Sequence, residues 1–323
     1  MSLIEQAAKR LEQLRQAGVE LPEETAHHAV PAARKDSDKA NRNDVDPYAV
    51  DIRPPKSAKE EKPVAAPSAK RVELNLDAIS ASGLLVPQAS YSQRQLADEF
   101  RVIKRPLIAN AMGKGNQPIA NGNLIMITSA LPGEGKSFTA INLAISIAME
   151  LDNTVMLVDA DVARPSVLNM LGLPPATGLL DVLGKNSVDI SGVLLRTNVE
   201  KLSILPSGTQ HPRATELLAS EAMVRLLDDM GSRYSDRIII FDSPPLLLTT
   251  ESRALATHMG QIVIVVQAEN TPQAVVKQAV DTVQACPVKM MVLNQARQAS
   301  SDGYGYGYGY GYGYGNGHEK RKK

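Results

Sequence analysis

The stretch NLIMITSALPGEGKSFTAINLAISIA, residues 123–148, joins an apolar run to a glycine-rich loop and a second apolar run. Its centre follows the pattern G-x-x-x-x-G-K-[ST], except that Ala130 stands at the first glycine position. Gly133 and Gly135 allow backbone N–H groups to turn inward around phosphate oxygens, and a helix start adds partial positive charge. The stretch therefore predicts a strand, a phosphate-binding loop and a helix.

Lys136 and Ser137 follow the last glycine of this loop. In nucleotide-binding loops of this pattern the lysine reaches the β- and γ-phosphates, and the serine hydroxyl ligates Mg²⁺. The alternative is an accidental glycine-rich loop, but two acidic motifs further along the chain argue against it.

The two acidic motifs each place aspartate at the end of an apolar run. The stretch NTVMLVDADVARPSV brings Asp159 and Asp161, and RIIIFDSPPLLL brings Asp242. In open α/β sheets, ligands bind at the carboxyl ends of the strands. Carboxylates at that edge can hold Mg²⁺ and its waters or accept a proton, so the three aspartates are predicted to share one nucleotide site.

Apolar runs alternate with amphipathic stretches from about residue 73 onward. Runs such as RIIIF (237–241) and IVIVV (262–266) are continuous, which is typical of strands buried on both faces. Residues 214–230 are one of the amphipathic stretches and predict a helix. The alternation predicts an α/β fold with a doubly wound, mostly parallel sheet that carries helices on both faces.

The chain outside this region differs in composition. Residues 1–20 have apolar side chains at three- and four-residue spacing and predict an amphipathic helix, which either packs on the same chain or docks a partner. Residues 21–72 have too little apolar surface to offset the entropy of ordering and predict a disordered linker. The predicted domain spans 73–299, and a flexible tyrosine-rich tail spans 300–323.

Overall composition limits the classes of partner. The net charge is +0, which argues against general binding to nucleic acid or to a membrane surface. The single cysteine, Cys286, allows no intramolecular disulfide and is compatible with a reducing compartment. The charged N-terminus is no secretory signal, and no run of about 18 apolar residues appears, so we expect a cytoplasmic protein without a transmembrane span.

The motifs SALPGEGKS, LVDADVARP and FDSPP together resemble the bacterial tyrosine kinases of exopolysaccharide and capsule biosynthesis. The resemblance covers roughly residues 75–323. Within the family, the chain is similar to the cytoplasmic autokinases of the exosortase-associated type, which are not fused to a membrane protein. It implies a P-loop NTPase fold, ATP and Mg²⁺ as cofactors, and transfer of phosphate to tyrosine.

The resemblance also implies roles for individual residues. The nucleotide-binding set is Gly133, Glu134, Gly135, Lys136, Ser137, Phe138 and, where related proteins read the adenine, Asn294. The catalytic set is Lys136, Asp159, Asp161 and Asp242, with Asp159 as the candidate base for the tyrosine hydroxyl. The metal set is Ser137, Asp159 and Asp242.

Two positions depart from the family pattern. The family usually has an arginine four residues after the first aspartate of the second motif, Asp159. This chain has Ala163 at that position, and Arg164 follows it. The family's ring-forming helix motif corresponds to the oligomerisation set Asp98, Arg101 and Lys104, in which lysine lacks the planar fork of arginine. Arg105 is the alternative partner, and a solvated charged face is the alternative interpretation of the whole motif.

The tail contains GYGYGYGYGYGYG, residues 303–315, with a glycine between successive tyrosines. Glycine disfavours any helix or strand that would hide these side chains, and 15 residues extend at most about 50 Å. A self-associating low-complexity segment is the alternative. We expect the tail to be the phosphoacceptor, at Tyr304, Tyr306, Tyr308, Tyr310, Tyr312 and Tyr314.

The resemblance implies partners as well. It implies a transmembrane polysaccharide co-polymerase, or chain-length determinant, as activator, a ring-shaped homo-oligomer, and a phosphotyrosine phosphatase. The protein is then expected at the inner membrane through its partner, where it regulates polysaccharide polymerisation or export.

Two other functions remain open at this stage. One is a positioning ATPase similar to the partitioning and cell-division (ParA/MinD-like) ATPases, whose signature lysine corresponds to Leu131 here. The other is a scaffold that uses nucleotide only to switch its assembly state.

Overall fold

The computed structural model describes residues 69–296, except 89–90, 116, 185–188 and 234–235. The chain divides into two units, Met1–Lys62 and Pro63–Lys323, and all described residues belong to the second. The predictions for residues 1–20, for most of the linker and for the tyrosine tail lie outside the described residues.

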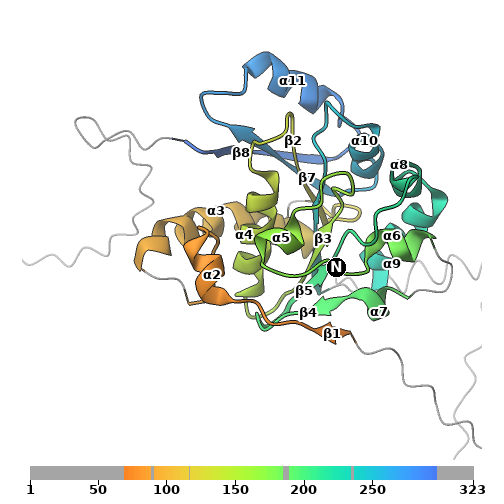
Figure 1. Cartoon of the computed structure of the whole chain (residues 1–323). Coiled ribbons are helices and arrows are strands. Elements are labelled where there is room, and N and C mark those ends of the chain that lie inside the picture. Colours follow the sequence, from red (N-terminus) through yellow and green to blue (C-terminus); the bar gives the residue numbers. More distant parts are fainter. Residues whose placement is uncertain (1–68, 89–90, 116, 185–188, 234–235, 297–323) are drawn as a thin grey trace, which may run out of the picture. The chain divides into compact units, whose positions relative to one another are not determined.

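The described part of the chain is built on an eight-stranded sheet in the order β1-β4-β5-β3-β6-β2-β7-β8 (Figure 1). All neighbouring strands are parallel except the antiparallel pair β4 and β5. The strands are β1 (Lys70–Arg71), β2 (Leu124–Ser129), β3 (Thr154–Asp159), β4 (Leu195–Arg196), β5 (Leu202–Leu205), β6 (Arg237–Asp242), β7 (Gln261–Gln267) and β8 (Val288–Asn294).

Helices lie on both faces of this sheet, which confirms the predicted fold class (Figure 1). The helices are α2 (Leu76–Ala81), the 3₁₀ helix η1 (Tyr91–Gln93), α3 (Arg94–Ala111), α4 (Lys136–Ala148), α5 (Val167–Met170), α6 (Leu179–Gly184), α7 (Ile190–Val193), α8 (Ala214–Leu218), α9 (Glu221–Arg233), α10 (Thr250–Ala256) and α11 (Gln273–Asp281). None of them is long and apolar enough to cross a lipid bilayer.

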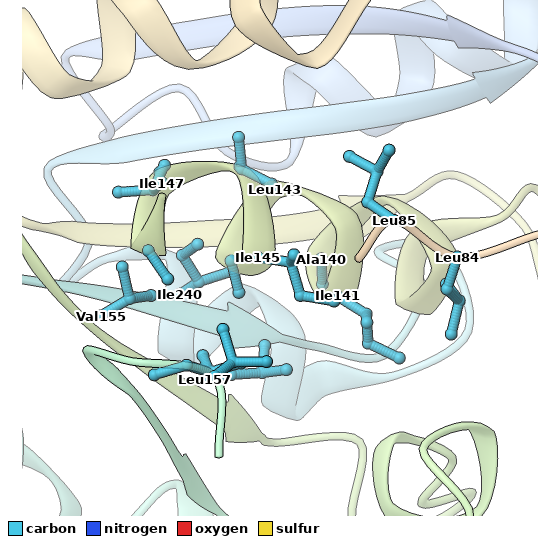
Figure 2. Close-up of a cluster of buried hydrophobic side chains, with 14 of the residues drawn as sticks. Leu84, Leu85, Ala140, Ile141, Leu143, Ile145, Ile147, Val155, Leu157 and Ile240 are labelled. Carbon is cyan, nitrogen blue, oxygen red and sulfur yellow. The ribbon is translucent and has the colours of Figure 1, made fainter. Parts of the chain in front are cut away.

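Two apolar cores result from the alternation of side chains along the strands. Val155, Leu157 and Ile240 pack against α4 on one face, where Figure 2 shows them beneath Ile141 and Ile145. The residues between them on the same strands, such as Met156 and Phe241, pack on the opposite face with side chains of α6, α9, α10 and α11. Continuous apolar strands are needed because both faces of the sheet are covered.

Two local features differ from the sequence-based expectation. Lys70 and Arg71 lie in the predicted linker, yet they form β1 and pair in parallel with β4. The predicted helix over 214–230 is two helices, α8 and α9. The break is at Ser220, whose hydroxyl accepts a hydrogen bond from Met223 N at 3.3 Å and so caps the start of α9.

The topology brings the motifs to one edge of the sheet. β2 lies between β6 and β7, and β3 pairs with the other side of β6. Asp159 and Asp242 are direct register partners at the ends of β3 and β6, and Ile127 of β2 pairs with Asp242. The glycine-rich loop after β2 therefore stands beside both acidic strand ends.

Candidate active site

The loop between β2 and α4 depends on two glycines in the left-handed region of backbone space. Gly133 has φ +84° and Gly135 has φ +94°, which side chains other than hydrogen rarely allow. A Cβ on Gly135 would also lie 2.0 Å from Asn294 Nδ2. Ala130, which replaces the first glycine of the pattern, is fully buried, so the loop accommodates its methyl group in the core.

Glu134 and Asn294 hold this loop from behind. The Glu134 side chain is 1% exposed and accepts hydrogen bonds from Leu131 N at 2.6 Å and from the Thr271 hydroxyl. Asn294 Nδ2 donates to the Glu134 carbonyl at 2.9 Å. Both residues were predicted to bind nucleotide. In the structure, their side chains form hydrogen bonds within the loop and with its neighbours.

Phe138, also in the predicted nucleotide set, lies in the first turn of α4. Its ring is partly buried and packs against the core on the α3–α4 side of the sheet. Its carbonyl accepts a hydrogen bond from Asn142 Nδ2 at 2.9 Å. The described contacts of Phe138 are therefore those of a packing residue at the base of the loop.

Lys136 is the cation of the site. Its Nζ lies 2.7 Å from Asp161 Oδ2 and 3.9 Å from Asp242 Oδ1, and its side chain is 12% exposed. Burial alone would lower the pKa of Lys136, but Asp242 and Asp161 outweigh it and raise that pKa above its ordinary value. Lys136 is thus firmly charged and surrounded by carboxylates that phosphate oxygens could replace.

Asp159 and Asp242 are buried carboxylates with unused oxygen atoms. Asp159 Oδ2 accepts from Ser166 N at 3.2 Å and Val167 N at 3.1 Å, while its Oδ1 has no hydrogen-bond partner among the described residues. Neither oxygen of Asp242 has one. Burial, followed by repulsion from Asp242, raises the pKa of Asp159 to about 7, and burial raises the pKa of Asp242 to about 6.

These oxygens suit a magnesium ion. The Ser137 hydroxyl accepts a hydrogen bond from the Ser166 hydroxyl at 2.8 Å, and Ser137 is the second residue of α4. Among the described residues no group of three or more His, Cys, Asp or Glu side chains could hold a metal. Mg²⁺ usually takes one or two carboxylates and completes its shell with waters and substrate phosphates, so Ser137, Asp159 and Asp242 fit it.

Sequence reasoning missed two residues that shape the site. Ser166 links the end of β3 to Ser137, and Thr271 bonds the buried carboxylate of Glu134 from a loop 137 residues away. The serine after Arg164-Pro165 is a helix N-cap signal that could have been noticed. No pattern in the sequence points to Thr271.

The predicted ring-forming helix is α3, and one of its three residues is not on the surface. Asp98 and Arg101 are exposed and pair with each other. Lys104 is 5% exposed, with Nζ 2.6 Å from the Ser146 carbonyl and 2.7 Å from Glu150 Oε1. Lys104 is therefore committed to α4 and removed from any contact surface, whereas Arg105, the alternative, is exposed.

Comparison with known proteins bears on the whole region. The model of a family described as "AAA domain" matches residues 122–295, more than half of the chain. The tyrosine-protein kinase YwqD of Bacillus subtilis (strain 168) is 34% identical over 167 residues, which cover 52% of this chain and 69% of that protein.

A second relative is much longer than this chain. The succinoglycan biosynthesis transport protein ExoP of Rhizobium meliloti (strain 1021) is 32% identical over 184 residues, 56% of this chain but only 22% of that protein. Among solved structures, the chimerical protein CapA2B2 matches with a TM-score of 0.55 and 28% identity, and the match covers 72% of this chain and 95% of that one.

Proposed function

The chain carries an AAA domain and belongs to the bacterial tyrosine-protein kinases, and on that premise we propose that it transfers the γ-phosphoryl group of ATP to tyrosines of its own C-terminal tail. The observation that carries the proposal is the convergence of Lys136, Asp161 and Asp242 at the glycine-rich loop. One cation, two acids and a phosphate-binding loop at a strand edge are what phosphoryl transfer requires.

In the transfer step, the phenol oxygen of a tyrosine forms a bond to the γ-phosphorus. The bond from that phosphorus to the bridging oxygen breaks, and ADP leaves with the electron pair. The phenol proton passes to a carboxylate after β3, for which Asp159 and Asp161 are the two candidates. Lys136 and the loop N–H groups stabilise negative charge on the moving phosphoryl group.

Mg²⁺, held by Ser137, Asp159 and Asp242, would neutralise charge on the β- and γ-phosphate oxygens. Asp159 Oδ1 and both carboxylate oxygens of Asp242, which would hold the metal, are buried atoms without a hydrogen-bond partner among the described residues. Ser166 orients the Ser137 hydroxyl, and the backbone N–H groups of Ser166 and Val167 hold Asp159 in place.

The position of the tail supports autophosphorylation. Asn294 ends β8 and touches the phosphate loop, and the described fold ends two residues later at residue 296. The six tyrosines of 303–315 therefore follow the site closely in the chain. When extended, a chain of this length is long enough to reach the site of a neighbouring copy or its own site.

The names of the relatives support a biological setting. ExoP is named for succinoglycan biosynthesis and transport, and its matching region is a small part of a longer protein. We assign this chain to control of exopolysaccharide polymerisation or export, with a transmembrane co-polymerase as activator at the inner membrane. A phosphatase would reverse the modification, and a ring of copies would form through the exposed Asp98 and Arg101 of α3.

The test is incubation of the purified full chain with [γ-³²P]ATP and Mg²⁺, with and without a peptide from the cytoplasmic segments of the co-polymerase. We expect phosphotyrosine in the tail, lost on deletion of 303–323 and reduced about 10³-fold or more in Lys136→Met. Lys277→Met, an exposed lysine on α11, is the matched control and should retain transfer.

Other outcomes would replace the proposal. ATP hydrolysis without phosphotyrosine, even with the activating peptide, would indicate a positioning ATPase. A change in assembly state on nucleotide binding, with neither hydrolysis nor transfer, would indicate a nucleotide-switched scaffold.

A further inference from the structure

A pocket of about 330 Å³ opens beside the phosphate loop, between that loop and the turn that follows β6. Lys136 and Asp161 line it together with an apolar wall of Pro132, Pro244, Pro245 and Leu248. We call it the Leu248 pocket. Its lining includes Lys136 and Asp161, which form the 2.7 Å ion pair at the loop.

Leu248 is exposed at this pocket although the leucines before it are not. Leu246 is fully buried, Leu247 packs against the core, and Leu248 is 61% exposed. A large apolar side chain left outward at the mouth of a functional pocket is a typical contact for a ligand.

The wall that presents Leu248 is rigid. Two consecutive prolines fix the backbone after β6. The Pro244 carbonyl accepts from the Thr128 hydroxyl at 2.8 Å, and Leu246 N donates to the Ser129 carbonyl at 2.8 Å, so β2 fixes the turn. The pocket is therefore formed before any ligand binds, which reduces the entropy lost on binding.

The chemistry of the lining matches a phenol. An aromatic ring with a hydroxyl at its far end needs an apolar wall along its length and polar groups at its tip. The Leu248 pocket has an apolar lining of prolines and Leu248, and its polar lining includes Lys136, Asp161, Arg164 and Ser166. A serine or threonine side chain is too short to use the wall, so the pocket favours tyrosine.

A second pocket competes for the same role. It measures about 650 Å³ and is lined by Asp159, Leu168, Asn169 and residues of the 207–210 loop, but not by Lys136. The cation that stabilises the transferred phosphoryl group must lie beside the acceptor oxygen. The position of Lys136 favours the smaller pocket.

We propose that the Leu248 pocket is the acceptor subsite, in which Leu248 holds the ring of the incoming tyrosine and determines the preference for tyrosine. This rests on the proposed kinase function. The glycines on either side of each tail tyrosine fit the proposal, because they let the backbone approach the pocket mouth without steric conflict.

The experiment separates acceptor binding from nucleotide binding. The parent is the full chain with its six tail tyrosines changed to serine, and a free peptide GYGYG is supplied as substrate. Phosphate is measured on the peptide alone, because Tyr48, Tyr91 and Tyr234 remain in the chain. The changes are Tyr304→Ser, Tyr306→Ser, Tyr308→Ser, Tyr310→Ser, Tyr312→Ser and Tyr314→Ser. KM for the peptide, KM for ATP and kcat are measured in this background, with the activating peptide present.

Leu248→Ser should raise KM for the peptide on the order of tenfold and leave KM for ATP within twofold, because a lost apolar contact costs about that much. Leu248→Met, which keeps an apolar side chain, should restore peptide binding. Leu151→Ser is the matched control, since Leu151 is 85% exposed and precedes the start of β3, whereas Asp159 is at the other end of that strand. It should change neither KM.

Three results would overturn the proposal. A peptide KM within twofold of the parent in Leu248→Ser would remove Leu248 from the acceptor site. A rise in peptide KM in Asn169→Ala, with none in Leu248→Ser, would transfer the role to the larger pocket. If the unchanged chain forms no phosphotyrosine at all, the kinase proposal itself fails, and the subsite fails with it.

Discussion

Lys104 and Asp242 are both charged side chains inside the fold, yet their surroundings are opposite in kind. Lys104 donates to the Ser146 carbonyl at 2.6 Å and pairs with Glu150 at 2.7 Å. Asp242 is 0% exposed, and neither of its carboxylate oxygens has a hydrogen-bond partner among the described residues. The fold satisfies the first buried charge and leaves the second available.

The difference separates stability from function. A buried ion that is fully hydrogen-bonded can contribute to folding, whereas one without hydrogen bonds, such as Asp242 with Lys136 at 3.9 Å, reduces the free energy of unfolding. Lys104 belongs to α3, and its Nζ donates to the Ser146 carbonyl in the last turn of α4. That carbonyl would otherwise be unpaired, so Lys104 helps to cap the C-terminal end of α4. Asp242 stands where a metal and a nucleotide would supply the missing partners.

The largest stability effect is expected for Lys104→Met. Methionine preserves the length and most of the volume of the side chain but removes the charged donor, so the Ser146 carbonyl and Glu150 lose their partner. We expect the free energy of unfolding to fall by about 2–3 kcal/mol, the range for a lost hydrogen bond to a charged group. Chemical denaturation of both proteins measures it.

Arg101→Met is the control for that measurement. Arg101 lies on the same helix with an exposed ion pair and should change the free energy of unfolding by less than about 0.5 kcal/mol. If Lys104→Met changes the free energy of unfolding as little as Arg101→Met does, then Lys104 does not cap α4. The prediction that Lys104 lies on the contact surface of α3 would then be open again.

Lys104 also shows where sequence reasoning reaches its limit. The motif on α3 predicts a charged surface, and Lys104 and Arg105 are adjacent in the chain and alike in charge. Which of the two points inward depends on Ser146 and Glu150, residues 42 and more positions away. No local pattern contains that information.

The strands and the loop were predictable because their signals are local. Apolar runs that end in Asp159 and Asp242, and the glycine spacing before Lys136, indicate both the sheet and the edge where the site lies. Glu134 and Asn294, which were predicted to bind nucleotide, lie at the glycine-rich loop, and the direction of their side chains depends on long-range contacts. The sequence predicted that these residues lie near the loop, but it did not predict where their side chains point.

Asp242→Asn should act in the opposite direction to Lys104→Met. The cost of burying the Asp242 charge exceeds its attraction to Lys136 at 3.9 Å, so removing that charge should raise the free energy of unfolding at pH 7.5 by about 1–2 kcal/mol, in the absence of Mg²⁺ and ATP. The same variant should lose tyrosine phosphorylation, because the metal loses a carboxylate. A variant that is destabilised at pH 7.5 would show that the attraction between Asp242 and Lys136 outweighs the cost of burying the Asp242 charge.

The pH dependence sharpens this test. Asp159, with a pKa of about 7, and Asp242, with a pKa of about 6, bind protons more tightly in the folded protein than in the unfolded chain. Their contribution to stability is present at acid pH and is lost as pH rises from about 4 to about 7. Asp242→Asn should therefore be clearly more stable than the unchanged protein at pH 7.5 and only slightly more stable at pH 4.5. Thermal unfolding at both pH values measures the difference.

The smallest stability effect, but a visible change in assembly, is expected for Arg101→Ala. Its exposed pair with Asp98 contributes less than about 0.5 kcal/mol to folding, so the melting temperature should barely change. If α3 forms the ring proposed above, the mass measured by light scattering should fall toward that of one chain. Arg105→Ala tests the neighbouring exposed arginine in the same way. A mass unaffected by either change would mean that the charged face of α3 is solvated, and that Lys104 is the one residue of the motif with a structural role.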